Sequence, residues 1–314
     1  MRPRDWAALL GLGFIWGASY LFIKVAVRDF PPATLVVVRL GLAGGLLAGL
    51  VAVRGLPAPR SPRVWARLVL LGTVSGGIPI GLIAWGERTL TSGAASILNA
   101  TTPLWAVLFG HWTREDPLGA DRVVGVTLGF AGVAVLVGAD PAAVTREDLA
   151  GAGAVVLASA LYAWGILYAR RTFQGIDPVV LAAGSLLGGA AGLLPAAVLS
   201  GFPAKPSAES VGSLLALSVF GSAVAYLLYY HLVLNVRPTQ TALVTYLNPA
   251  TAVFWGWLVL GEPVTGQTLA GLVLIVAGIA VVNARLTAAG SAAAPRGSPV
   301  APPRSPQTGS GRRR

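Results

Sequence analysis

The sequence predicts an all-α integral membrane protein of ten transmembrane helices, arranged as two inverted five-helix repeats. Apolar residues make up 55% of the 314-residue chain and charged residues only 11%, whereas soluble domains carry about 25% charged residues. The mean hydropathy of +0.72 indicates a chain that lies mostly in lipid. The third observation is internal repetition, because similar segments recur at offsets of 146 to 149 residues.

Ten long uncharged segments follow one another along the chain, and most approach the ~20 residues that a spanning helix needs. They show little of the polar-face alternation that helices of a soluble core carry. The second segment reaches spanning length only if its helix starts near residue 33, ahead of Arg39. In order, the segments are 6–23, 40–53, 68–86, 89–113, 123–139, 149–169, 178–204, 210–236, 238–261 and 263–284.

The basic residues follow a topological pattern. With the N-terminus inside, the inner segments hold 17 of the 23 Lys and Arg residues and the outer segments hold four, which is the bias of membrane proteins. The net charge of +11 therefore follows from topology, and no basic face on a soluble module indicates a nucleic-acid partner. We predict a multi-pass protein of the cytoplasmic (inner) membrane with both termini in the cytoplasm.

The repetition divides the chain into two halves. SILNATTPLWAVLFGHW (96–112) aligns with TYLNPATAVFWGWLVLG (245–261), and GVTLGFAGVAVLVG (125–138) matches GLVLIVAGIAVVN (271–283). Because each half has an odd number of spans, the two halves cross the membrane in opposite senses. The predicted domains are the first five-helix repeat at 1–139, the second at 140–286, and a disordered basic cytoplasmic tail at 287–314.

The alignment sets Asn99 against Asn248, each in the middle of a fourth helix and near a Pro. A buried Asn needs a partner, and Pro removes a backbone donor. Inverted repeats place a substrate site near the midplane, where irregular backbone is tolerated because it lines a cavity. Two interpretations stay open: these residues line the pathway, or they bond neighbouring helices.

The segments WGASYLFIK (16–24), VVVRL (36–40) and LNPATAVFWGWLVLGEPVTGQTLAGLVLIVAGIAVV (247–282) resemble the EamA family of the drug/metabolite transporter superfamily. The resemblance covers about residues 3–286. It implies the ten-helix drug/metabolite transporter fold, alternating access, and movement of small metabolites such as amino acids, nucleosides or drug-like molecules. It does not fix the substrate.

Lys24 and Arg39 are the two cations inside predicted spans. A charge at membrane depth faces a polar cavity or a partner, or it snorkels to the interface. For Arg39 two roles are open: attraction of an anionic group such as a substrate carboxylate, or organisation of helix packing around backbone carbonyls. Both cations flank the same outer loop, so they could form one positive patch.

Aromatic and polar side chains deep in the spans are the candidates for the cavity wall, although some Trp and Tyr belong to the interfacial belt. The predicted substrate-pathway residues are Trp16, Tyr20, Arg39, Asn99, Thr102, Trp164, Tyr168, Tyr226, Tyr230, Tyr246 and Asn248. The candidates for a gate or for ion coupling are Lys24, Glu87, His231 and Glu262. For His231 a packed or interfacial role is the alternative.

The predicted function is a secondary transporter for a small metabolite, an amino acid or a related zwitterionic or anionic compound, with export favoured. Related small drug/proton antiporters depend on a carboxylate inside the first helix, and WAALLGLGFIWGASYLFIK carries none. This disfavours proton-coupled efflux of drugs or cations, which stays the alternative because Glu87 and Glu262 lie near helix ends.

An enzyme is the rival class. His111 and Asp116 have the spacing of an acyltransferase His-Asp pair, in which His would be the general base, but no further motif of that kind follows. With no Cys and only two His, we expect no metal site and no cofactor. The expected partners are the small-molecule substrate and membrane lipid. A monomer suffices to build the pathway, and a dimer is compatible with it.

Overall fold

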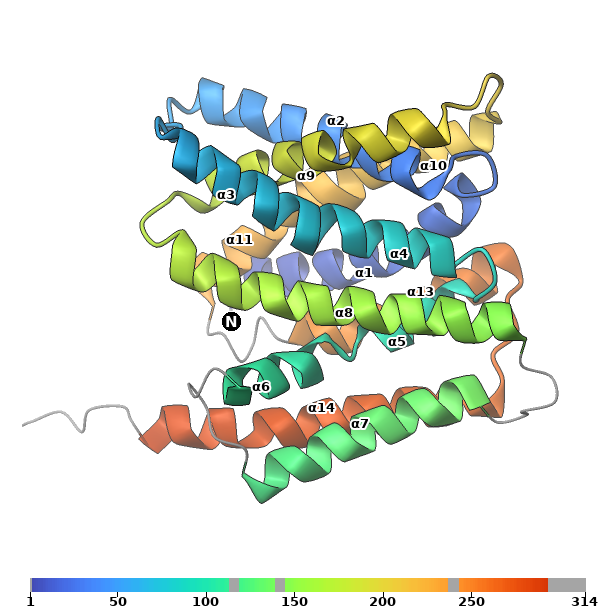
Figure 1. Ribbon diagram of the computed structural model, residues 1–314. Coiled ribbons are helices and arrows are strands. Elements are labelled where there is room, and N and C mark those ends of the chain that lie inside the picture. The colour runs from blue at the N-terminus through green and yellow to red at the C-terminus, as the bar shows by residue number, and fades with distance from the viewer. Residues whose placement is uncertain (1, 113–118, 139–144, 237–242, 293–314) are drawn as a thin grey trace, which may run out of the picture.

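The computed structural model describes residues 2–112, 119–138, 145–236 and 243–292, and the regular structure in these ranges is helical (Figure 1). The first half contains α1 (Pro3–Ala26), α2 (Pro32–Val53), α3 (Pro62–Gly72), the π-helical turn η1 (Thr73–Gly77), α4 (Ile78–Gly86), α5 (Ser92–Asn99), α6 (Thr102–Trp112) and α7 (Ala120–Gly138). The second half contains α8 (Arg146–Thr172), α9 (Pro178–Ser200), α10 (Ala208–Ser218), the π-helical turn η2 (Val219–Val224), α11 (Ala225–Asn235), α13 (Leu243–Leu260) and α14 (Gly266–Ala292).

These elements form ten helices in the order of the ten predicted spans, because α3, η1 and α4 make one continuous helix, as do α10, η2 and α11. The pair α5 and α6 fills the fourth position as a broken helix. Seven helices of the described residues are long and apolar enough to cross a membrane, and shorter apolar stretches occur at Arg122–Leu136 and Gly266–Val281. The predicted all-helical architecture is confirmed.

The packing of the helices follows a two-fold relationship between the halves. The second helices of the two halves, α2 and α9, pack on each other, and so do the fifth helices, α7 and α14 (Figure 1). The contact of α1 with α13 has its counterpart in the contact of α8 with α6, and that of α3 with α9 in that of α10 with α2. Such exchange of partners is the arrangement expected of inverted repeats.

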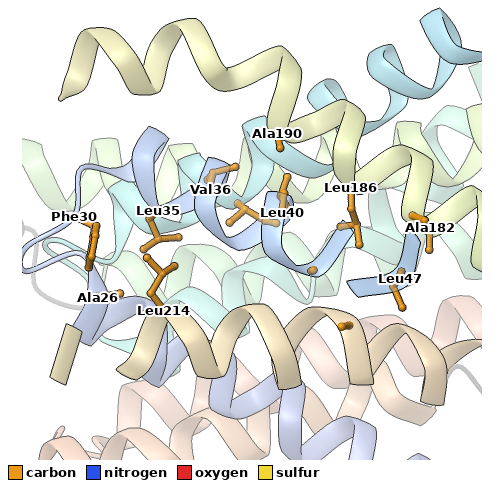
Figure 2. Close-up of a cluster of buried hydrophobic side chains, with 14 residues drawn as sticks. Ala26, Phe30, Leu35, Val36, Leu40, Leu47, Ala182, Leu186, Ala190 and Leu214 are labelled. Carbon is orange, nitrogen blue, oxygen red and sulfur yellow. The ribbon is translucent and has the colours of Figure 1, made fainter. Parts of the chain in front are cut away.

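The largest buried apolar cluster lies where α2 meets α9 and α10. Figure 2 shows Leu35, Leu40 and Leu47 of α2 between Leu186 of α9 and Leu214 of α10. These five side chains are at most 4% exposed. The cluster therefore joins the first half to the second, and it fixes the position of the neighbouring Arg39 on the same helix.

Glycines allow the helix backbones to approach closely. A Cβ atom on Gly188 of α9 would lie 2.8 Å from the carbonyl oxygen of Leu68 in α3, and one on Gly278 of α14 would lie 2.5 Å from the carbonyl oxygen of Gly125 in α7. Lipid offers no hydrophobic drive to helix association, so small residues at the crossing gain packing contacts instead. The high glycine content, 40 residues, has a structural cause at these crossings.

Two boundaries differ from the sequence expectation. The predicted fourth span at 89–113 is interrupted after Asn99. The last helix, α14, continues to Ala292, past the predicted start of the tail at 287, and residues 293–314 lie outside the described ranges. The start of α1 and the end of α14 lie at the same end of the bundle, and the turn after α4 lies at the other end (Figure 1).

Candidate substrate pathway

The break between α5 and α6 has a local cause in the sequence Asn-Ala-Thr-Thr-Pro. Pro103 has no backbone N–H and its ring disfavours a helical turn before it. Thr101 donates its hydroxyl to the carbonyl oxygen of Leu98 at 2.8 Å, and Thr102 donates to that of Asn99 at 2.8 Å. The two hydroxyls thus bond to carbonyls at the C-terminal end of α5, although the Leu98 carbonyl also accepts the backbone N–H of Thr101 at 3.2 Å. Thr102, a predicted pathway residue, acts here as a cap.

Asn99 lies at this break and faces α1. Its Nδ2 donates to the hydroxyl oxygen of Tyr20 at 2.8 Å, and Tyr20 is only 7% exposed. The Oδ1 atom of Asn99 is buried and has no hydrogen-bond partner. A buried acceptor without a partner is unfavourable by about 1–3 kcal/mol, so this atom is a candidate to receive a donor from a ligand.

Asn248 holds the equivalent position in the second half, in a different setting. It lies within α13, which continues through Pro249 without a break. Thr251 of the same helix donates to the carbonyl oxygen of Gly13 in α1 at 2.9 Å. The Oδ1 atom of Asn248 is buried and unpartnered, like that of Asn99. The two halves are therefore alike in sequence at this point and different in conformation.

Arg39 is buried, with 7% of its surface exposed. Its Nε donates to the hydroxyl oxygen of Ser222 at 2.9 Å, and its Nη2 donates to the carbonyl oxygen of Gly221 at 3.3 Å. Both partners belong to η2, the π-helical turn of the second half. A π-turn inserts an extra residue into a helix and often marks a functional position. A Cβ atom on Gly221 would lie 2.7 Å from the Ser19 hydroxyl oxygen, so a larger residue there would displace the Ser19 side chain.

The titratable groups that act on Arg39 are three tyrosines and one carboxyl group. Its electrostatic neighbours are Tyr162 of α8, Tyr226 of α11, Tyr20 of α1 and Glu87. Within the described residues, no carboxylate forms an ion pair with its guanidinium. The guanidinium carries five N–H donors in a planar fork, which suits a carboxylate ligand. Arg39 is thus a buried cation held by neutral acceptors where the two halves meet.

Lys24 and Arg39 have different hydrogen-bond partners, although both act electrostatically on Glu87. The Nζ of Lys24 donates to the carbonyl oxygens of Glu87 and Leu90, the latter at 2.6 Å. These carbonyls belong to the turn between α4 and α5. A cation at the C-terminal end of a helix also meets the negative end of the helix dipole. Lys24 therefore ties α1 to the end of α4.

Glu87 directly follows α4 and is 0% exposed. Neither of its carboxyl oxygens has a hydrogen-bond partner. Burial raises the pKa of Glu87 well above its usual value, and the nearby Lys24 offsets part of that rise. A buried carboxyl group without a partner is uncommon and often belongs to a functional site.

Glu262 has a different role at the same end of the bundle. Its Oε1 accepts a hydrogen bond from the backbone N–H of Ser92 at 2.9 Å, and its Oε2 accepts from the Ser92 hydroxyl at 2.7 Å. Ser92 is the first residue of α5, where backbone N–H groups lack helical partners. Glu262 therefore caps α5 of the other half, which is a structural function.

His231 lies near the opposite end of the bundle, on α11. Its Nε2 is 3.1 Å from Oδ1 of Asp5, a buried residue of α1. The Oδ2 atom of Asp5 accepts the backbone N–H of Arg2 at 2.9 Å. The pair connects the start of the first helix of one half with the third helix of the other half.

The remaining predicted aromatic residues do not form one cluster. Trp16 packs on Tyr229 with ring centroids 5.7 Å apart, whereas Trp164 stacks on Tyr168 at 4.9 Å. Tyr246 packs against the apolar cluster of α5, α6 and α14. The side chain of Tyr230 lies outside the described residues, and so does Asp116, the predicted partner of His111.

The structure brings together Tyr20, Arg39, Asn99 and Tyr226, and it adds Tyr162, Gly221 and Ser222 to them. Sequence reasoning did not select Ser222, because a Ser in an apolar helix carries no sign of its partner. The π-helical turns η1 and η2 begin at equivalent positions of the third helices. An open groove of about 590 Å³ lies elsewhere, between α1, α10 and the end of α13, with Arg28 and Glu209 among its lining residues.

Comparison with known proteins gives consistent results. The sequence model of the EamA-like transporter family matches residues 6–138 and 149–284. The chain is 30% identical over 281 residues to the uncharacterized inner membrane transporter YedA of Escherichia coli K12, covering 87% of this chain and 86% of that protein. It is 24% identical to the uncharacterized transporter YoaV of Bacillus subtilis over 277 residues, or 86% of this chain and 94% of the relative.

One solved structure, a crystal structure described only as that of a protein, shares the fold. It superposes with a TM-score of 0.64 over 93% of this chain and 99% of that chain, at 20% sequence identity.

Proposed function

The chain belongs to the EamA-like transporter family, and from this premise we propose that it moves a small zwitterionic or anionic metabolite across the membrane by alternating access. The family membership makes it a membrane transporter of the drug/metabolite transporter superfamily. Because the family is one of transporters, the acyltransferase built on His111 and Asp116 is not retained. An amino acid or a related compound is the proposed substrate class.

The observation that carries the proposal is the environment of Arg39. This cation is buried between the two halves, its hydrogen-bond acceptors among the described residues are the uncharged Ser222 and Gly221, and tyrosines are its neighbours. A buried charge without a counter-ion is unfavourable by several kcal/mol, and a substrate carboxylate would supply the missing charge. Inverted-repeat transporters hold their substrate at such a junction.

Buried polar atoms without partners on the two fourth helices are further candidates for substrate contacts. They include the Oδ1 atoms of Asn99 and Asn248 and the indole N–H groups of Trp105 and Trp255. Each half thus contributes one free acceptor and one free donor on its fourth helix. A zwitterion such as an amino acid offers both donors and acceptors to such groups.

Localisation, direction and domain boundaries are part of the proposal. The positive-inside bias of the loops supports a cytoplasmic position for the end of the bundle at which α1 starts and α14 ends (Figure 1). We propose export of the substrate, through one pathway built by repeats at 1–139 and 140–286. A single chain suffices for this pathway.

Counterflow in proteoliposomes tests the proposal. We would load vesicles with unlabelled compound and follow uptake of labelled neutral, acidic and basic amino acids, nucleosides and one lipophilic cation, with and without a pH gradient. Saturable exchange of a zwitterion or an anion is the expected result. Movement of the lipophilic cation alone, driven by the gradient, would contradict it and favour proton-coupled efflux, for which the buried Glu87 is the supporting observation.

A further inference from the structure

The turn between α4 and α5 holds a carboxyl group that the substrate proposal does not use. Glu87 is 0% exposed, and both of its oxygens are buried without a hydrogen-bond partner. Ionised, this group would be a buried charge that accepts no hydrogen bond, which is far less favourable than the neutral acid. The geometry therefore suits the protonated form.

The nearest cation is engaged elsewhere in this conformation. Lys24 directs its ammonium to the backbone carbonyls of Glu87 and Leu90 rather than to the Glu87 carboxyl group. An ammonium has three N–H donors, and two of them bind these carbonyls. The same ammonium could reach a Glu87 carboxylate after a small rearrangement, because it already touches the backbone of that residue.

The charged and titratable groups that face Glu87 come from several elements. Lys24 and Tyr20 lie on α1, Arg39 lies on α2, and Glu262 follows α13. Glu262 is already bound to the N-terminus of α5, and Arg39 to η2. On α8, which packs on α4, Tyr162 neighbours Arg39 and Asp148 neighbours Thr89. Lys24 is therefore the group best placed to stabilise a Glu87 carboxylate.

We propose that Glu87 is a proton-binding site whose proton is released when water enters between α1 and the turn that joins α4 to α5. In the packed conformation the group is the neutral acid. When water reaches it, its O–H bond breaks, the proton passes to water at that face, and the carboxylate pairs with the nearby Lys24 ammonium, which leaves the carbonyls of residues 87 and 90. The reverse sequence takes up one proton when the interface closes.

The coupling of this site to transport rests on the proposed function, whereas the proton site itself does not. If the interface opens during alternating access, each cycle carries the proton between the two conformations, and the proton gradient biases the direction of substrate movement. Proton and substrate movement would then be coupled through an acid at the end of the third helix, whereas the apolar segment of the first helix carries no acid.

Infrared spectroscopy of the purified full-length protein in lipid tests the site without a substrate. Exposed carboxyl groups are ionised at neutral pH, because their ordinary pKa values are about 4. We expect the C=O stretching band of a protonated carboxyl group to persist at neutral pH in the wild type and to disappear as the pH rises. Glu87→Gln should abolish the band, while Glu209→Gln, at an exposed carboxylate of α10, should leave it unchanged.

The second variant is Lys24→Gln, which removes the cation that stabilises the carboxylate. The midpoint at which the band is lost should move to higher pH. Absence of any protonated-carboxyl band in the wild type at neutral pH, or a band that survives in Glu87→Gln, would overturn the proton site. Should Glu87→Gln not fold, the wild-type band and the Lys24→Gln shift still decide.

Counterflow separates the two proposals. If a substrate is exchanged, Glu87→Gln should retain the exchange but lose its stimulation by a pH gradient. A Glu87→Gln variant that keeps both the exchange and the stimulation would overturn the coupling. If the infrared band is present and no zwitterion or anion is exchanged, the proton site stands and the metabolite function fails. If exchange occurs without the band, the metabolite function stands and the proton site fails.

Discussion

Arg39 of α2 donates through its Nε to the hydroxyl oxygen of Ser222 in η2 at 2.9 Å, and this bond joins the two halves of the transporter inside the membrane. The π-helical turn brings the Gly221 carbonyl oxygen to the same guanidinium. Arg39 thus organises helix packing, one of the two roles open for it from the sequence. The remaining donors of the guanidinium are the part of the group that a substrate carboxylate could use.

Replacing Arg39 by Lys should separate these roles. Lys keeps the charge but has three donors on a compact ammonium, so it cannot hold two protein acceptors and also bind a carboxylate through two bonds. We expect counterflow to fall about tenfold or more, as when one partner of a buried charge pair is truncated. Lys24→Ala should reduce counterflow less, because Lys24 binds only turn carbonyls among the described residues. Thermal unfolding in detergent gives the control for folding.

A purely structural Arg39 would give a different pattern. Arg39→Lys and Ser222→Ala would then both lower the unfolding temperature, and counterflow per folded molecule would stay at the wild-type level for each. That outcome would remove the carboxylate from the proposal.

Tyr20→Phe and Asn99→Leu should distinguish pathway lining from helix bonding at the broken fourth helix. Tyr20→Phe removes only the hydroxyl that accepts the Asn99 amide, a bond worth about 1 kcal/mol. If Asn99 receives substrate through its free Oδ1, Asn99→Leu should reduce counterflow much more than Tyr20→Phe does, at similar stability. If both variants lower the unfolding temperature equally and leave counterflow unchanged, Asn99 has a packing role instead.

The stability of the wild type should depend on pH through Glu87. Because burial raises the folded-state pKa of Glu87, the folded protein holds this proton at pH values at which the unfolded chain has lost it. Stability is then lost as the pH rises above the unfolded value of about 4.3. Glu87→Gln should remove this dependence and raise the unfolding temperature at neutral pH. A Glu87→Gln variant with a lower unfolding temperature than the wild type at neutral pH would contradict the expectation.

Glu262→Gln should weaken the contact between the halves at the α5 N-terminus. The carboxylate accepts two short hydrogen bonds from Ser92, and an amide has only one accepting oxygen to offer. Loss of a helix cap destabilises by about 1 kcal/mol, so the unfolding temperature should drop by a few degrees. Glu209→Gln, an exposed control on α10, should not change it. An unchanged unfolding temperature in Glu262→Gln would refute the capping role.

Gly278→Ala should be destabilising, whereas Gly45→Ala should be close to neutral. A Cβ atom on Gly278 would meet the backbone of α7, 2.5 Å from the Gly125 carbonyl oxygen, while one on Gly45 would have no neighbour within 4 Å. Overpacking of this kind destabilises by about 1–3 kcal/mol. Thermal unfolding of both variants measures the difference, and equal unfolding temperatures would show that α7 and α14 separate easily.

Much of the fold could be predicted from the sequence because its causes are local in the chain. Long uncharged segments must be helical in lipid, since each backbone polar group needs an internal partner there. The repeat offset between Asn99 and Asn248 and the odd number of spans then required inversion. The break at Asn99 follows from Thr101, Thr102 and Pro103, whereas α13 is continuous through Pro249, although a Pro lies beside Asn248 as well.

Residue composition and order determined the membrane spans, their number and the duplication, because hydropathy and chain repetition do not depend on which helices touch. Only the tertiary structure decided what the polar residues do. Arg39 meets η2 across 182 or more residues of chain, Lys24 binds carbonyls instead of joining Arg39, and Glu262 caps a helix while Glu87 has no partner. Partner choice depends on distances between helices that are remote in sequence, and such distances are set by packing.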